Sequence, residues 1–212
     1  CDNLPSNGRT VRRVLARFST LVDPALGSWI EAHVACPCTM VDRIVPATTD
    51  TDRSRISAAL GVEDAWPVIS EPFIQWVIED HFPTGRPAWE RAGAEFVGEV
   101  APYELMKLRM LNGAHSALAY LGYLAGHETV ADASNDPLFA GYMAGLWAEA
   151  APTLPPGLDS GDYAMRLLAR FQNRAIRHRL WQIAMDGSQK LPQRLLGTIR
   201  DRLAKGEPID HI

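Results

Sequence analysis

The stretch YELMKLRMLNGAHSALAYLG, residues 103–122, decides how this chain is interpreted. Apolar residues recur at helical spacing along it, and the same pattern continues to about residue 125. It predicts one long helix over 103–125 that ends near Gly122 and Gly126. Three of its polar residues, Lys107, Asn112 and His115, stand among the apolar positions.

The spacing of these three residues allows two interpretations. On a straight α-helix His115 lies about 80° and Asn112 about 140° around the axis from Lys107, and His115 lies roughly 12 Å along it. The three side chains could therefore line one extended ligand of about six carbons. Apolar neighbours would favour a neutral amine at Lys107, which can exchange a proton with a substrate oxygen. Alternatively, Lys107 is solvated, Asn112 marks a helix irregularity and His115 is a core histidine.

Outside this segment the chain is mainly helical. Two short β-branched or alternating runs, residues 39–46 and 72–80, predict strands, and residues 85–97 between elements are expected to be connecting structure. No repeat or linker divides the chain, so we expect a mainly α, multi-helical fold with a small β element. A further helix is predicted to follow Thr49–Asp52 and to run through about residue 60, and others are predicted at 10–22, 24–34, 136–149, 160–171, 174–185 and 191–204.

Composition excludes several classes of protein. With 47% hydrophobic residues, 22% charged residues and a net charge of -4, the 212 residues suit a globular protein without nucleic acid as its partner. No apolar run approaches the ~20 residues of a membrane span. Three cysteines, Cys1, Cys36 and Cys38, suggest reduced thiols in a cytoplasm. The spacing of His33, Cys36 and Cys38 matches no common zinc site, so no metal is expected.

Nucleotide-binding motifs are missing from the sequence. No two of the sixteen glycines stand two positions apart, so the chain has no G-x-G, and it has no phosphate-binding P-loop. The chain also opens CDNLPSNG, without an initiator Met. We therefore expect a piece of a longer protein whose cofactor is bound elsewhere.

Several ordered blocks resemble one family. Lys107, Asn112 and His115 match the pattern K-x-x-x-x-N-x-x-H of the mannitol dehydrogenase family, the long-chain polyol-specific dehydrogenases. The last block that resembles the family, HRLWQIAMDGSQKLPQR (178–194), is most similar to its fructuronate reductase (D-mannonate oxidoreductase) branch. The other blocks, in the family's order, are CDNLPSNG (1–8), CTMVDRIVP (38–46) and WVIEDHFPTGRPAWERAGAEFV (76–97).

The resemblance implies a domain organisation and a cofactor. Residues 1–212 would form the C-terminal substrate and catalytic domain, with a fold like that of the 6-phosphogluconate dehydrogenase C-terminal domain. The N-terminal Rossmann domain, absent from this chain, would be its partner and would bind NAD or NADP. The isolated chain would then be inactive. The discriminating residues lie upstream, so NAD and NADP both stay open, as does the oligomeric state.

The resemblance also implies roles for single residues. Lys107 would be the general acid/base, Asn112 and Asn3 would polarise the reacting oxygen, and His115 would contact a substrate hydroxyl. The substrate would be a sugar acid or a polyol, with no metal involved. Residues that could hold a carboxylate are Arg177, Arg179, Lys190 and Arg194. Asp42 and Arg43 could bind other substrate groups, or they could form a structural ion pair at the end of the strand.

Three functions are compatible with these features. The first is the interconversion of D-mannonate and D-fructuronate by hydride transfer. The nearest alternative is a mannitol 2-dehydrogenase or another polyol dehydrogenase, which needs no carboxylate clamp. A different class is a non-catalytic helical domain for interaction or oligomerisation, in which the polar residues of 103–122 are structural.

Overall fold

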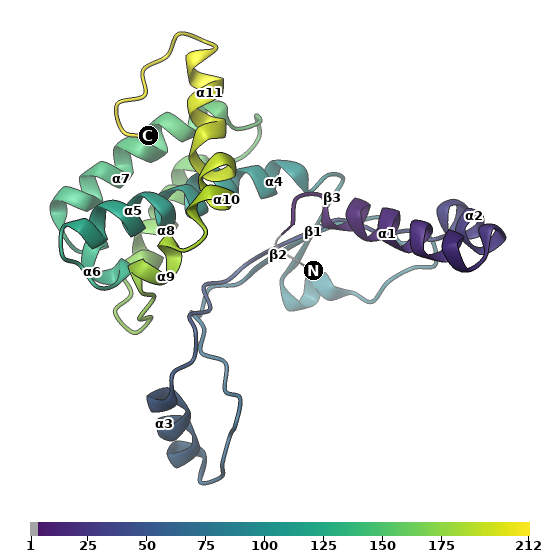
Figure 1. Ribbon diagram of the computed structural model, residues 1–212, viewed down its shortest axis with the longest axis horizontal. Helices are drawn as coiled ribbons and strands as arrows, with labels where there is room; N and C mark the ends of the chain where they lie inside the picture. Colours follow the sequence, from purple (N-terminus) through teal and green to yellow (C-terminus); the bar gives the residue numbers. More distant parts are fainter. Residues whose placement is uncertain (1–3) are drawn as a thin grey trace. The chain divides into compact units, whose positions relative to one another are not determined.

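The computed structural model describes residues 4–212, which fold as two compact units. The first unit comprises the chain up to Asp42 together with Ile74–Leu105, and the second comprises Arg43–Phe73 together with Met106–Ile212. The chain therefore passes from the first unit into the second, returns, and finally stays in the second (Figure 1).

The first unit begins with a helical hairpin. Helices α1 (Asn7–Val22) and α2 (Pro24–His33) lie side by side (Figure 1). Asp23 ends the first helix and caps the second, because its carboxylate accepts the N–H of Ala25 at 2.8 Å. Pro24 then occupies the first helical position, where its missing N–H costs nothing. The predicted helices at 10–22 and 24–34 are confirmed within a few residues at their ends.

A three-stranded sheet completes this unit. Strand β1 (Thr39–Asp42) pairs antiparallel with β2 (Gln75–Glu79), which pairs parallel with β3 (Ala94–Val97). Its buried side chains include Met40 and Val77, which are partners in the register. The strands are shorter than the predicted 39–46 and 72–80, because the chain leaves the sheet at Asp42.

Our expectation that residues 85–97 only connect elements was wrong. A 3₁₀ turn, η1 (Trp89–Ala92), ends at Gly93, which has a φ of 91°. Few residues other than glycine adopt this left-handed backbone conformation. At Gly93 it turns the chain directly into β3. The strand has only four residues, too few for an alternation pattern to identify it.

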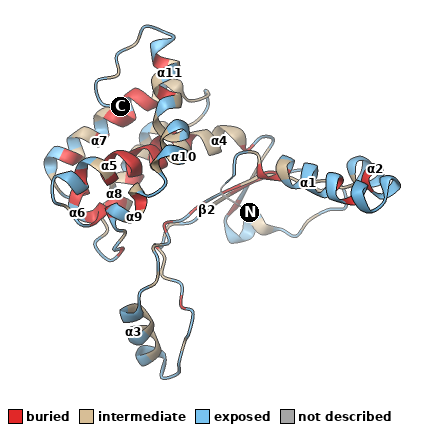
Figure 2. Ribbon diagram, viewed as in Figure 1, coloured by how far each residue is buried: buried red, intermediate tan, exposed pale blue. Residues whose placement is uncertain are grey.

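The second unit includes an excursion, residues 43–73, that carries α3 (Asp50–Leu60). Thr49 and Asp52 form the capping box that starts this helix, so the helix begins at Asp50, inside the segment 49–52 that was expected to precede it. None of the residues of α3 is buried (Figure 2). The excursion is anchored at its base, where Glu71 accepts two hydrogen bonds from Arg170, at 2.7 and 3.0 Å.

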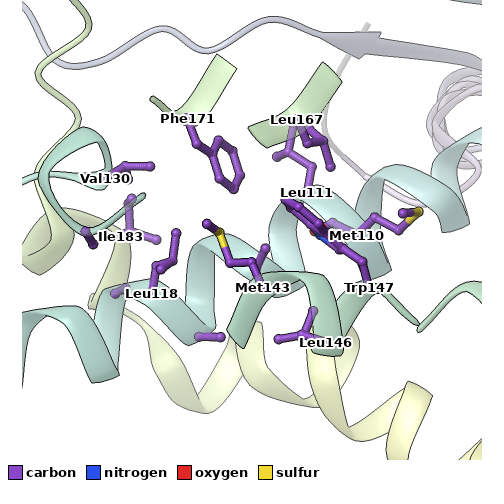
Figure 3. Close-up of a cluster of buried hydrophobic side chains, with 14 of the residues drawn as sticks. Met110, Leu111, Leu118, Val130, Met143, Leu146, Trp147, Leu167, Phe171 and Ile183 are labelled. Carbon is purple, nitrogen blue, oxygen red and sulfur yellow. The ribbon is translucent and has the colours of Figure 1, made fainter. Parts of the chain in front are cut away.

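The core of the second unit surrounds one buried helix. A continuous helical segment runs through α4 (Ala101–Met106), a π-helical turn η2 (Lys107–Asn112) and α5 (Gly113–Leu124). The small residues of α5 let neighbouring helices approach closely, and most of the helix is buried (Figure 2). Figure 3 shows side chains from this segment, from α7 (Pro137–Ala150) and from α8 (Ser160–Phe171) packed together. The residues labelled there are Met110, Leu111, Leu118, Val130, Met143, Leu146, Trp147, Leu167, Phe171 and Ile183.

The second unit combines two long helices that the sequence predicts with several short elements. The helix predicted at 136–149 is shifted by one residue, and the one at 160–171 has the predicted bounds. The expected fold class, mainly α with a small β element, is confirmed. The short elements are α6 (Val130–Ser134), η3 (Ala151–Thr153), α9 (Leu180–Ala184), α10 (Gly187–Leu191), the π-helical turn η4 (Pro192–Leu196) and α11 (Gly197–Leu203).

The helix predicted over 174–185 was wrong in its first half. Asn173 forms a local turn in which its side chain accepts the N–H of Ala175 at 3.0 Å. The following backbone is extended and pairs with a distant loop, where Val130 donates to the carbonyl of His178 and Leu180 donates to that of Glu128. Only Leu180–Ala184 remains helical.

Candidate active site

The predicted straight α-helix is widened where the polar residues lie. Lys107–Asn112 forms a π-helical turn, in which the N–H of Gly113 donates to the carbonyl of Leu108, five residues earlier. The angles expected for an α-helix therefore do not apply between Lys107 and His115. Single π-turns within α-helices are rare and frequently mark functional sites.

Two buried side chains hold this turn in place. The indole Nε1–H of Trp147 donates to the carbonyl of Met110, inside the turn, at 3.0 Å. Arg109 donates to the carbonyl of Thr153 at 2.9 Å and to the carboxylate of Asp201 at 2.5 Å. These hydrogen bonds connect the widened turn to α7, to η3 and to α11.

The second π-turn packs against the first. A Cβ added at Gly113 would lie 3.2 Å from the carbonyl oxygen of Arg194, which belongs to η4. Arg194 also donates to the hydroxyl of Ser116 at 3.1 Å, and burial lowers the pKa of its guanidinium. Because an arginine keeps its charge in proteins, this contact places a positive charge beside α5.

His115 is buried, with 5% of its surface exposed. Its ring stacks on Phe171, with centroids 4.5 Å apart, and meets the edge of His178 at 5.3 Å. Within residues 4–212, no group forms a hydrogen bond with its Nε2. An enclosed, unpaired nitrogen of this kind suits a ligand hydroxyl.

Electrostatics keep this imidazole neutral. Burial first, and then the electrostatic influence of His178, Arg194, Arg170 and Lys107, hold the pKa of His115 well below its usual range. A neutral imidazole can accept one hydrogen bond and donate another, whereas the protonated ring only donates. Lys107 and Arg194 are thus among the charged groups that act on His115.

Of the other predicted catalytic residues, the structure describes Asn112 and Lys107. Asn112 is 9% exposed and ends the π-turn, three residues before His115, and Lys107 begins the turn with its side chain half-buried. Asn3 lies outside the described residues. The structure therefore brings Lys107, Asn112 and His115 into one segment of the second unit.

The four predicted carboxylate-binding residues divide into two groups. Arg194 joins the His115 site, and Lys190 lies in the same stretch, where its ammonium is 3.8 Å from Asp186. Arg177 and Arg179 do not join it. They flank His178 in extended backbone, where alternate side chains point to opposite sides. His178 faces His115, whereas both arginines reach Glu128, at 3.5 and 3.8 Å.

Asp42 and Arg43 lie where the chain passes from the first unit to the second. Asp42 is buried at the end of β1. The guanidinium of Arg43 donates to the carbonyl of Glu71 at 2.9 Å. Arg43 therefore helps to anchor the excursion that carries α3.

Sequence reasoning missed His178 and Arg170. Both act electrostatically on His115, and burial lowers the pKa of His178. His178 was overlooked because residues 174–185 were predicted as a helix, on which it would not alternate with its arginine neighbours. In residues 4–212 no group of three or more metal-ligating side chains occurs, and no helix is long and apolar enough to cross a membrane.

Comparison with known proteins identifies the family. Residues 99–212 match the family model described as Mannitol dehydrogenase C-terminal domain, and residues 1–91 match the one described as Mannitol dehydrogenase Rossmann domain. The chain belongs to the mannitol dehydrogenase family. Such matches report sequence similarity over a range, so the assignment of all 212 residues to a C-terminal domain stays a prediction.

Individual relatives are similar along almost the whole chain. An uncharacterized oxidoreductase, YdfI, of Escherichia coli is 55% identical over 99% of this chain and 44% of the relative. The D-mannonate oxidoreductase of the same organism is 52% identical over 100% of this chain and 44% of the relative. The chain thus spans less than half the length of these relatives.

A solved structure is also similar. The mannitol 2-dehydrogenase of Pseudomonas fluorescens, in a ternary complex with NAD and D-mannitol, superposes with a TM-score of 0.85 at 46% identity. The superposition covers 98% of this chain and 43% of that one. The fold described above is therefore that of the corresponding part of a mannitol 2-dehydrogenase.

Proposed function

We propose that this chain carries the substrate-binding and proton-transfer residues of an NAD(P)-dependent oxidoreductase that interconverts D-mannonate and D-fructuronate. The observation that carries the proposal is the π-turn from Lys107 to Asn112, which leads into the neutral, enclosed imidazole of His115. Family membership and the 52% identity to a D-mannonate oxidoreductase support this reaction class.

Lys107 is the proposed general acid/base. The nicotinamide cofactor, when bound, supplies or accepts the hydride. In the reducing direction the Lys107 ammonium gives a proton to the oxygen of the ketone, and in the oxidising direction the neutral amine removes it from the alcohol. The amides of Asn112 and Asn3 donate N–H groups to the same oxygen and stabilise the negative charge that develops there. These donors fill the role that a metal ion has in other dehydrogenases.

The remaining residues orient the substrate. Neutral His115 exchanges hydrogen bonds with a neighbouring hydroxyl through its unpaired Nε2. Arg194, whose charge already acts on His115, holds the carboxylate that distinguishes a sugar acid from a polyol. Lys190, on α10, is the proposed second cation for that carboxylate.

Residues 1–91 match the Rossmann domain model but contain no G-x-G, so the cofactor site is proposed to lie mainly in a part of the Rossmann domain that these 212 residues do not include. The solved relative contains NAD, and we propose NAD or NADP here. The isolated chain is then expected to turn over neither mannonate nor fructuronate. We further propose a cytoplasmic location, from the reduced thiols that the cysteine usage suggests.

The test is Lys107→Ala in the full-length protein. We expect kcat on fructuronate to fall by about 10²- to 10⁴-fold, since a positioned acid/base contributes that much. Near-normal turnover at every pH, with only lower stability, would instead support a structural role and a non-catalytic helical domain.

A mannitol 2-dehydrogenase is the second candidate, favoured by the 46% identity to the solved mannitol complex. The rates of the full-length protein on fructuronate and on fructose separate the two. A sugar-acid enzyme is expected to prefer fructuronate, because only that substrate offers a carboxylate to Arg194. A preference for fructose would assign the polyol reaction.

A further inference from the structure

A cavity in the second unit lies outside the site described above. It has a volume of about 840 Å³ and is formed between the excursion, at residues 46–55 and 69, and the segment 174–185. Its size suits a small metabolite, since ligand pockets commonly span ~300–1,000 Å³.

Four guanidinium groups line this cavity: those of Arg55, Arg174, Arg177 and Arg179. The extended backbone at 177–179 turns the two flanking arginines to the side opposite His178, which faces His115. Within residues 177–179, the two arginines therefore point to the cavity and His178 points to the proposed catalytic site.

The positive charge here is only partly neutralised. Asp52, the acidic residue among the described lining groups, is 3.3 Å from Arg55, and hydrogen bonds from Thr49 lower the pKa of its carboxyl. Glu128 reaches Arg177 and Arg179 only at 3.5 and 3.8 Å. Exposed pairs at such distances are weak, so both guanidiniums can turn to a stronger acceptor.

Apolar side chains line the remainder. Trp181 and Met185, on the same wall of the cavity as the arginines, are 49% and 52% exposed, and Ile69 faces them from the excursion. An exposed indole offers a surface on which a planar group can stack. The cavity thus combines several cations with an apolar platform.

We propose that this cavity binds a small organic phosphate ester. Its dianionic head group lies between Arg174 and Arg177, and its planar or apolar body lies on Trp181. Guanidinium groups from separate chain positions can each bind phosphate oxygens in a bidentate manner, which favours a phosphate over a single carboxylate. Nothing in this proposal depends on Lys107 or on the reaction proposed above.

The experiment titrates the full-length protein with phenyl phosphate and follows heat by calorimetry and tryptophan fluorescence, to which Trp181 contributes. We expect saturable binding at one site, an affinity at least tenfold lower for Arg174→Gln and for Arg177→Gln, and loss of the fluorescence change in Trp181→Leu. Arg200→Gln removes an exposed arginine of α11 and serves as the matched control, with unchanged affinity expected. Circular dichroism checks that each variant is folded.

Two further titrations test where the ligand binds and which acidic group it needs. Lys107→Ala is expected to bind phenyl phosphate normally, and loss of binding there would move the ligand to the catalytic site and overturn the proposal. Phenylacetate is expected to bind at least tenfold more weakly, and equal affinity would contradict the phosphate assignment. Absence of saturable binding at about 10 mM, or equal affinity of the arginine variants and the wild type, would also overturn it.

Discussion

At the scale of single residues, His115 links the site to the stability of the fold. Its pKa is lowered in the folded protein by burial and by neighbouring positive charges, so the unfolded chain binds a proton more readily. Stability therefore rises with pH wherever the unfolded state is protonated and the folded state is not. On acidification, stability is lost as the pH falls below the ordinary histidine value of about 6.5.

Because acidification destabilises the folded protein, His115 gives a prediction about stability and pH. Below about pH 6.5 the free energy of unfolding should fall by on the order of 1 kcal/mol per pH unit for each fully affected histidine, which measurements between pH 7.5 and 5.5 cover. His115→Gln should remove part of this slope, which urea denaturation at several pH values measures. His81→Gln, at an exposed position of the first unit, is the control. Equal slopes in all three proteins would show that His115 titrates normally in the folded state.

Arg194 carries the prediction about substrate choice. Arg194→Gln removes the charge beside α5 while keeping a group that can reach the hydroxyl of Ser116. KM for fructuronate in the full-length protein should rise about tenfold or more, because a charge-assisted hydrogen bond contributes roughly 1.5–3 kcal/mol. KM for fructose should change far less. If both values change equally, the residue orients the site as a whole rather than holding a carboxylate.

At the scale of elements, sequence patterns predicted the regular helices but not the irregular segments. Asp23-Pro24 and the Thr49/Asp52 capping box determine helix starts through local hydrogen bonds, so a few residues are enough to predict them. The π-turn at 107–112 depends on Trp147 and Arg109 meeting distant carbonyl and carboxylate groups, and no local pattern contains that information. The same holds for residues 177–179, whose extended backbone depends on pairing with residues 128–130.

For the candidate site, the sequence predicted the residues of one helical segment but not which arginines lie near them. Lys107 and Asn112, which begin and end η2, and His115, in α5, are candidates that follow from helical spacing and the family pattern. The partition of the arginines was not predictable, because it depends on whether His178 lies on a helix or in extended backbone. Arg194 was one of four equivalent candidates until the packing of η4 against α5 distinguished it.

The contact between the two π-turns gives a prediction with a matched control. Gly113 and Gly141 both lie in helices, where alanine is favoured by about 1 kcal/mol. At Gly141 an added Cβ meets nothing within 4 Å, so Gly141→Ala should stabilise the protein by up to that amount. At Gly113 the Cβ would lie 3.2 Å from the Arg194 carbonyl, a backbone atom that cannot easily move. Gly113→Ala should therefore be at least about 1 kcal/mol less stable than Gly141→Ala in urea denaturation.

At the scale of the whole molecule, the interleaved path of the chain has to be held by long-range contacts. The excursion leaves β1 at Arg43, carries an exposed helix and returns at Phe73. Glu71 fixes its base, since its carboxylate accepts both Arg170 donors and the N–H of Ile44 at 2.6 Å. Arg170 also lies over the ring of Phe73, 3.9 Å from its centroid. One buried ion pair thus joins the two ends of the excursion to α8.

This arrangement predicts that the stability of the protein depends strongly on the ion pair between Glu71 and Arg170. Glu71→Gln removes a charged partner of the buried Arg170 guanidinium, since the side chains of Glu71 and Arg170 are only 2% and 7% exposed. Breaking such a pair costs about 3–5 kcal/mol, whereas replacing both partners with apolar residues is often far less damaging. The loss of unfolding free energy in the double variant Glu71→Leu/Arg170→Met should therefore be smaller than the sum of the losses in the single variants Glu71→Leu and Arg170→Met. Urea denaturation of the four proteins in this cycle measures the difference. Simple additivity would mean that the carboxylate and the guanidinium stabilise the fold independently, and that the backbone contacts of Ile44 hold the excursion.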